Sequence, residues 1–480
     1  MVASAQKKWF ALALLCAVQF MVVLDIAIVN VALPSIQVDL AFSQENLQWV
    51  ISAYALVFGG FLLLGGRMAD LLGRRRIFVA GIIVFTLGSL LCGLAWSETS
   101  LIAARALQGL GAAIISPAAL SILGVTFTEG KERNIALGAW GAVGGFGAAA
   151  GVLLGGVLTD ALSWEWIFFV NLPFGLAALA LAPVLLGESR DAHTKSFDAI
   201  GAVLVTAGLV TLVFGITQAN DYGWGSVSTW AIFAGSLALL AAFVGWERRH
   251  PEPLMRFGIL RTRTVLGANV AGFILGTALF AMFLMLTLYA QQVLGYSAMK
   301  TGIAYLATAG TAIFWAGLSA SLVNKVGVKP VLIAGMSFLS LGLLYFTQVS
   351  VGGSYLGDLL PGFLLIGIGM GFSFVPISIA ALAGIAPEEQ GLASGLINTS
   401  QQIGGALGIA ALAAIANSRT TAAIADGTAV PDALVSGFQA AFWGGAIVAL
   451  VGVVAAVTLI RREELATDVA PDAAPATAAV

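Results

Sequence analysis

Long apolar stretches separated by short polar segments dominate the sequence. A helix needs ~20 mostly apolar residues to cross a bilayer core of ~30 Å, because its backbone groups must be paired within hydrocarbon. Fourteen stretches meet this requirement, at about 9–33, 47–66, 77–96, 101–124, 135–158, 166–186, 199–217, 228–246, 265–290, 301–323, 329–349, 357–385, 391–416 and 437–460. The ~10-residue alternation of membrane barrels is absent. The pattern therefore predicts an all-α integral membrane protein with 14 transmembrane helices.

Three of these stretches, the first, the seventh and the eighth, have a second interpretation. Lys7 and Lys8 before an apolar run are typical of a secretory signal peptide. The run continues to Leu33, however, past the ~7–15-residue core of a signal, and no small-x-small cleavage site follows it. A retained first span is the favoured reading. The seventh and eighth spans are the least certain pair, because Trp224 and Trp230 could mark the interfaces of a shorter pair.

The amino-acid composition excludes a water-soluble protein. Hydrophobic residues make up 59% of the chain and charged residues 10%, with a mean hydropathy of +0.98, whereas a soluble domain carries ~25% charged residues. The net charge of −2 excludes a nucleic-acid partner held by bulk electrostatics. The two cysteines and two histidines are too few and too scattered for a disulfide framework or a structural metal site.

The basic residues predict the orientation of the chain. Lys and Arg concentrate in cytoplasmic loops. With a cytoplasmic N-terminus, only Lys300 and Arg419 of the 22 basic residues fall on the other side, and Arg105 lies within a span. Both termini are therefore expected in the cytoplasm, and the Ala- and Pro-rich tail from about Ala466 is expected to be disordered.

An internal repeat divides the chain. At an offset of 257 positions, three glycines of the fifth span recur in the thirteenth: Gly138, Gly147 and Gly151 as Gly395, Gly404 and Gly408. We expect two pseudo-symmetric six-helix halves in the same orientation (1–186 and 265–460), an inserted helix pair with cytoplasmic loops (187–264) and a tail (461–480). Parallel halves that face one another are typical of secondary transporters with a site near the midplane.

The loop after the second span, residues 66–76, carries Gly66, Asp70, Gly73, Arg74 and Arg75. Glycine permits its tight turn, and its arginines can hold lipid phosphates. A plain cytoplasmic basic loop would share these features, but the full spacing resembles the signature loop of the major facilitator superfamily, and the resemblance covers nearly the whole chain. It implies a role in conformational gating for Gly66, Asp70, Gly73, Arg74 and Arg75.

Further segments resemble the fourteen-helix drug:proton antiporters within that superfamily. The segment 24–34, with Asp25, is similar to their first-span motif, although Ala27 replaces the usual threonine. The segment 101–113, with Arg105 and Gln108, is similar to the fourth-span motif implicated in proton transfer. The segment 164–173 matches another recurrent stretch of the same subfamily.

Glycines of the fifth span match the antiporter motif of these proteins: Gly138, Gly147, Gly151, Gly155 and Gly156. Val152 stands where the family has proline. Small residues four apart also simply allow close packing of membrane helices. The resemblance implies that this face seals the two halves against uncoupled proton leak, so we expect its glycines to pack against the other half.

Only Asp25 and Arg105 lie clearly inside the hydrocarbon. A charge within the membrane is unfavourable enough to indicate function. At ~1.5 Å per residue they lie ~12 and ~7 Å from the outer ends of their helices, so their side chains are expected to meet. A carboxyl group whose surroundings change with conformation can load and release protons. The alternative is a static structural ion pair.

Polar and aromatic residues in the spans suggest a substrate cavity. They suit amphipathic, aromatic molecules bound by shape, stacking and a few hydrogen bonds. Facing lipid or packing within a half are equally open roles for each of them. The candidates are Asn30, Gln108, Tyr289, Gln292, Trp315, Phe372, Asn398 and Gln402.

Together these features predict proton-coupled efflux of amphipathic drugs or antibiotics across a bacterial plasma membrane, by alternating access. We expect a monomer that uses the proton gradient and needs no cofactor, metal or nucleic acid. Transport of a metabolite, lipid or siderophore is the alternative. An enzyme is disfavoured, because the spans hold no His-rich or Ser/His constellation, and an ATP-driven pump would need a phosphate-binding Gly-x-x-x-x-Gly-Lys-[Ser/Thr] loop.

Overall fold

The computed structural model describes residues 5–43, 46–127, 131–190, 198–251, 253–255, 257–385 and 390–461. All regular elements in these ranges are helical. The predicted disordered tail lies outside them, apart from Arg461. The helices are α1 (Ala5–Asp39), α2 (Trp49–Leu72), α3 (Arg74–Gly93), α4 (Glu98–Thr126), α5 (Lys131–Ala161), α6 (Trp166–Phe169), α7 (Asn171–Leu185), α8 (Ala199–Tyr222), α9 (Val227–Glu247), α10 (Arg263–Leu288), α11 (Ala298–Val326), α12 (Val328–Phe346), α13 (Leu360–Ala381), α14 (Gln390–Ala425) and α15 (Val430–Leu459).

The fourteen predicted spans are confirmed as helices. Thirteen segments of the described residues are long and apolar enough to cross a membrane, and the 31-residue α5 supplies the fourteenth. The seventh and eighth spans are two full helices, α8 and α9. The sixth span differs from the prediction of one continuous helix, because the helix is interrupted at Val170 between α6 and α7.

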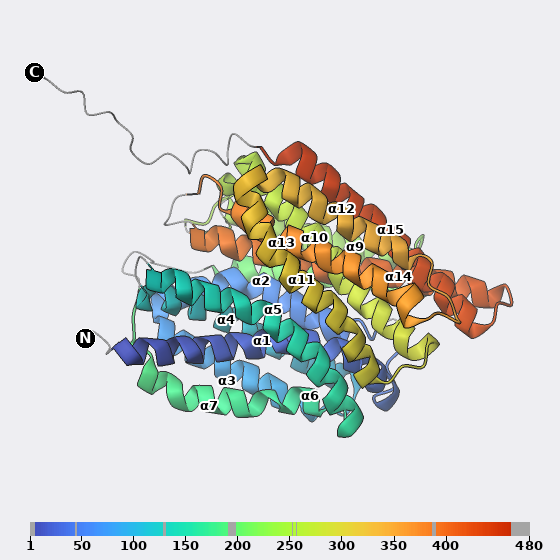
Figure 1. Cartoon of the computed structure of the whole chain (residues 1–480), viewed down its shortest axis with the longest axis horizontal. Coiled ribbons are helices and arrows are strands. Elements are labelled where there is room, and N and C mark those ends of the chain that lie inside the picture. Colours follow the sequence, from blue (N-terminus) through green and yellow to red (C-terminus); the bar gives the residue numbers. More distant parts are fainter. Residues whose placement is uncertain are drawn as a thin grey trace, which may run out of the picture.

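Helices α1–α7 and α10–α15 form two adjoining bundles, drawn from blue to green and from yellow to red in Figure 1. The most extensive packing between them joins α5 to α11 and α2 to α14. The inserted helices α8 and α9 pack on each other, and α8 also lies against α2 and α14. Residue-level domain boundaries between these bundles stay a prediction.

Two of the repeated glycine pairs, Gly147 with Gly404 and Gly151 with Gly408, pack against corresponding helices in the two bundles, whereas Gly395 faces Leu63 on α2. A Cβ atom on Gly151 would lie 2.8 Å from the Cβ of Ala27 on α1, and one on Gly408 would lie 2.6 Å from the Cα of Thr277 on α10. Helix α1 is the first span of the first bundle, and α10 is the first span of the second. The repeat seen in the sequence is therefore also a repeat of packing. Glycine is required because a larger residue would push these helices apart.

This packing corrects the expectation that the whole glycine face seals the two halves. Gly147, Gly151 and Gly155 all contact α1 within their own bundle. Gly156 instead faces the other bundle, where its Cβ would lie 2.6 Å from the Cα of Met299 on α11. Adjacent helix positions differ by ~100° in direction, so one motif serves two different interfaces. Gly138 lies on α5 as well.

Hydrogen bonds join the two bundles at the end of the molecule where α1 ends and α2 begins, which we call the distal end. Asp160 accepts hydrogen bonds from the backbone N–H groups of Ala298 (3.2 Å) and Met299 (2.9 Å) at the start of α11. Close by, the Gln291 amide donates to the backbone oxygen of Val31 at 2.8 Å. Hydrogen bonds between the bundles, among the described residues, concentrate at this end.

Candidate functional site

Asp25 on α1 and Arg105 on α4 meet in the interior of the first bundle, as the sequence predicted. The two side chains are 0% and 1% exposed, and Arg105 Nη1 donates to Asp25 Oδ2 at 2.6 Å. Glycine makes the approach of α4 possible, since a Cβ on Gly109 would lie 2.5 Å from the backbone oxygen of Tyr54 on α2. The pair is therefore positioned by close helix packing as well as by its own charge.

The second oxygen of Asp25 is held by two amides. Gln108 Nε2 and Asn171 Nδ2 donate to Oδ1 at 2.6 and 2.8 Å. The same two nitrogens also lie 3.1 and 3.0 Å from Ser89 Oγ, which itself donates to the backbone oxygen of Phe168. Asp25 thus accepts three hydrogen bonds, one from a cation, and such charge-assisted bonds stabilise the ionised carboxylate.

Arg105 is held on every side. Its Nε donates to the backbone oxygen of Val50 at 2.9 Å, and Nη1 also donates to Gln108 Oε1 at 2.6 Å. Its guanidinium carbon lies 4.4 Å from the ring centroid of Tyr54, within range of a cation–π interaction. The planar fork of arginine suits this arrangement, because a lysine could not reach these acceptors together.

The second bundle has no such network at the equivalent place. A Cβ on Gly88 would contact Gln108, and a Cβ on the equivalent Gly342 would contact Ile366, so these two contacts correspond. Three positions before Ile366 stands Phe363, where the first bundle has its buried arginine. Both of these second-bundle residues are buried and apolar.

The aspartate is also replaced. Gly151 faces Ala27 and Gly408 faces Thr277, and two positions before Thr277 stands the buried Leu275. At the two positions that correspond to Asp25 and Arg105, the second bundle therefore has the buried apolar residues Leu275 and Phe363.

The predicted basic loop is the junction of α2 and α3, where only Gly73 separates the two helices, and the residues around it bond within their own bundle. Asp70 Oδ1 accepts from Arg74 Nε and Nη2, at 3.1 and 2.9 Å, and from the hydroxyl of Ser121 on α4 at 3.3 Å. Gly66 packs against α4 too, since its Cβ would lie 3.5 Å from Pro117. Asp70 thus joins the start of α3 to α4.

The same loop is fixed to the segment that follows α7. Gly73 has a φ of +115°, a conformation that favours glycine. Arg75 Nη1 donates to the backbone oxygen of Leu186 at 3.2 Å, and its backbone N–H donates to Glu188 Oε1 at 3.2 Å. The residues around Gly73 therefore link α2 and α3 to α4 and to the segment that follows α7.

Two of the proposed cavity residues are placed elsewhere by the structure. Gln108 is fully buried inside the Asp25 network, and Tyr289 is 0% exposed and donates to the backbone oxygen of Ser350 within the second bundle. Neither lines an open cavity here. The reason is that the polar atoms of each side chain hydrogen-bond to partners within its own bundle. The position of a residue along a helix does not predict such partners.

The other candidates are dispersed. Trp315 and Phe372 form an edge-on aromatic pair 5.2 Å apart, and Gln292 donates to Gln37 at the distal end. Asn398 is exposed, with its amide bonded to its own helix. Asn30 and Gln402 are 9% and 7% exposed, the first bonded within α1 and the second beside Gly59 at the contact of α2 with α14. Their role in substrate binding stays a prediction.

Sequence reasoning missed Ser89 and Asn171 as members of the network. Asn171 lies in the recurrent segment 164–173, and it is a buried amide in a span, which was the available signal. The interruption of the helix at Val170 places it directly at the start of α7. Ser89 had no comparable signal, because serine is common in membrane helices.

Comparison with known proteins decides the family. The sequence profile of the Major Facilitator Superfamily matches residues 15–409. The chain belongs to the major facilitator superfamily. This is a transporter superfamily, so the chain is a multi-pass membrane transporter rather than an enzyme.

Individual relatives of this superfamily member are named for antibiotics. It is 40% identical to the puromycin resistance protein pur8 of Streptomyces alboniger over 90% of this chain and 86% of that protein. It is 41% identical to the cephamycin export protein CmcT of Amycolatopsis lactamdurans over 87% and 86%. A peptide transporter structure solved with sulfate shares the fold, with a TM-score of 0.67, 16% identity and 94% of each chain covered.

Proposed function

We propose that this transporter exports amphipathic antibiotics or drugs in exchange for protons, with Asp25 as the proton carrier. The observation that carries the proposal is the fully buried Asp25 with its three donors, at a position where the second bundle has the buried Leu275. The names of the relatives pur8 and CmcT support the substrate class. The transporter works as a monomer in the plasma membrane.

Protonation would rearrange this network. A neutral carboxyl group loses its ionic attraction to Arg105, and its protonated oxygen becomes a donor that needs an acceptor where it now has donors, while the other oxygen still accepts. Asn171 Oδ1 is buried and has no hydrogen-bond partner among the described residues. Rotation of that amide would offer this oxygen to the protonated Asp25. Helices α1, α4 and α7 would then repack, which couples the proton to the conformation of the bundle.

The positive-inside distribution assigns the distal end to the outside of the cell. In this structure the outer side is held by Asp160 and by the Gln291 contact between the bundles. Separation of the bundles at that end would release the substrate, and proton entry would return Asp25 to its neutral form. The basic loop with Asp70 would keep the inner ends of the first bundle together during this motion.

The decisive test uses purified protein in liposomes with an imposed pH gradient. Asp25→Asn removes the titratable group and keeps the size of the side chain. We expect it to bind puromycin and to lose puromycin-evoked proton movement. Asp221→Asn, an exposed acid at the end of α8, is the matched control and should keep wild-type flux. Coupled flux at the wild-type rate in Asp25→Asn would place the proton carrier elsewhere.

A further inference from the structure

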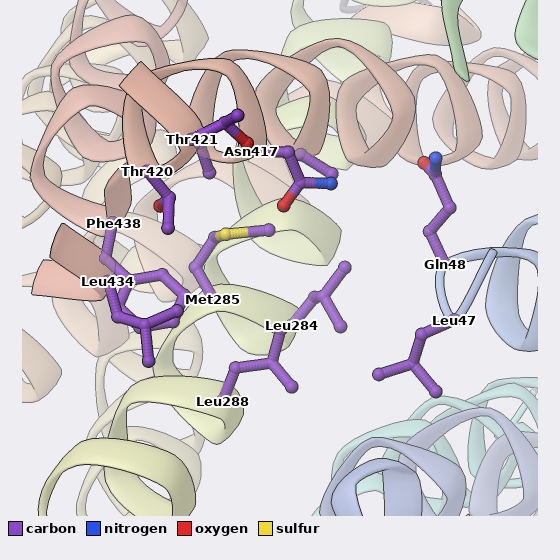
Figure 2. A pocket seen from close by; sticks show the side chains of 12 residues that line it. Leu47, Gln48, Leu284, Met285, Leu288, Asn417, Thr420, Thr421, Leu434 and Phe438 are labelled. Carbon is purple, nitrogen blue, oxygen red and sulfur yellow. The ribbon is translucent and has the colours of Figure 1, made fainter. Parts of the chain in front are cut away.

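A cavity of about 230 Å³ lies at the distal end, away from the Asp25 network. Figure 2 shows Leu284 and Met285 of α10 on one side of it, facing Asn417 and Thr420 of α14 on the other. Phe438 of α15 closes one end. None of the residues assigned to the proton site or to the predicted substrate cavity lines it.

The lining has an apolar side and a polar side. Leu284, Met285 and Phe438 are 2%, 3% and 2% exposed and supply the apolar side. The polar groups come from Asn417, Thr420 and Thr421 of α14 and from the buried Gln48 before α2. An amphipathic molecule fits such a lining with its apolar part against α10.

No lining residue is charged. The polar groups are amides and hydroxyls, which both donate and accept hydrogen bonds. A cation would lose its hydration here without gaining a carboxylate partner, so the site disfavours it. An uncharged molecule with hydroxyl or amide groups meets no such penalty.

Both halves contribute to the wall. Leu47 and Gln48, which lead into α2, belong to the first bundle, and the other lining residues belong to the second. Gln48 Nε2 also donates to Thr217 of α8 at 2.9 Å, so the inserted pair supports this wall. The volume lies below the ~300–1,000 Å³ of drug-sized pockets. Separation of the bundles at the distal end would draw Leu47 and Gln48 away from α10 and enlarge the cavity.

We propose that this cavity is a release-side binding site for uncharged amphipathic molecules, with the apolar part of the ligand against α10 and its hydrogen-bonding groups at Asn417 and the threonines. The inference rests on the proposed export function and names one class of its substrates. A ligand held there favours the state in which the distal end is open, since only that state accommodates it fully.

Binding of radiolabelled chloramphenicol, an uncharged aromatic molecule with hydroxyl and amide groups, tests the site on the purified full-length protein. Ala416→Leu adds three carbon atoms to the cavity wall, and Asn417→Leu removes the amide at similar volume. We expect each to weaken chloramphenicol binding about tenfold. Ala422→Leu, an exposed position on the same helix, is the control and should bind like the wild type. If Ala416→Leu fails to fold, the measurement on Asn417→Leu decides the test.

Three results would overturn the site: unchanged affinity in both cavity variants, equal weakening in Ala422→Leu, or displacement of chloramphenicol by the cation tetraphenylphosphonium with loss of that effect in Asn417→Leu. Asp25→Asn separates this inference from the export proposal. It should still bind chloramphenicol, and Asn417→Leu should weaken that binding about tenfold in the Asp25→Asn background as well, while coupling is lost. Wild-type coupling in Asp25→Asn would sink the export mechanism and leave the binding result standing.

Discussion

A single methyl group on Gly156 should open the distal end of the transporter. In Gly156→Ala the new Cβ would lie 2.6 Å from the Cα of Met299 and 2.7 Å from the backbone oxygen of Ala298. Favourable carbon contacts lie at ~3.5–4.0 Å, so α5 and α11 must move apart by about 1 Å. The obstacle is backbone on both helices, and a side-chain rotation cannot relieve it.

The size of the effect follows from that overlap. Overpacking of one methyl group against backbone costs about 1–3 kcal/mol. The strain exists only while the bundles touch, so it acts on the closed distal state and leaves the open one unaffected. A bias of that size changes the ratio of the two states by about 5- to 150-fold. Antibiotic export should fall, because the outer side no longer closes fully in each cycle.

Spin labels at Leu162 and Val430, exposed positions on opposite bundles at the distal end, report the separation directly. We expect a longer distance to become dominant in Gly156→Ala. Gly310→Ala, on α11, is the control, since no atom lies within 4 Å of its added Cβ. A distance distribution in Gly156→Ala identical to that of the wild type would refute the assignment of Gly156 to the contact between bundles.

Three further variants probe the same machinery. Arg105→Lys keeps the charge but loses the hydrogen bonds to the backbone oxygen of Val50 and to Gln108. Two bonds of about 1 kcal/mol each predict a roughly 30-fold loss of proton-coupled flux in liposomes, and wild-type flux would reduce Arg105 to a structural residue. Asn171→Leu removes a donor to Asp25, so flux should fall about tenfold with a changed pH profile; an unchanged profile would remove Asn171 from the coupling network. Asp160→Ala should lengthen the distal label distance less than Gly156→Ala does, because Asp160 is exposed to solvent; a larger shift would contradict this order.

The sequence was sufficient to place the ion pair. Rarity of charge in the spans singled out Asp25 and Arg105, and the rise per residue of a helix put them at comparable depths. Their contact at 2.6 Å confirms that step. The helix count was equally accessible, because a bilayer imposes one length on every span.

The surroundings of the pair were not accessible in the same way. Which face of a helix meets which neighbour depends on rotation about its axis, and rotation is set by packing against other helices. Gln108 was therefore assigned to a substrate cavity, although it bonds Asp25 within the bundle. The cavity of Figure 2 has no sequence signal for the same reason, since its lining comes from four separate segments of ordinary composition.

The glycine motif shows how one short pattern can hold two kinds of information. Gly155 contacts the backbone of Ile28 on α1, and the next residue, Gly156, contacts α11 of the other bundle. A change at Gly151 or Gly155 would therefore displace the helix that carries Asp25, whereas a change at Gly156 would displace the bundles. Both would lower export, so a transport assay alone cannot tell them apart. Two other measurements can tell them apart. A change at Gly151 or Gly155 should alter proton binding to Asp25, and a change at Gly156 should alter the distance between the spin labels at the distal end.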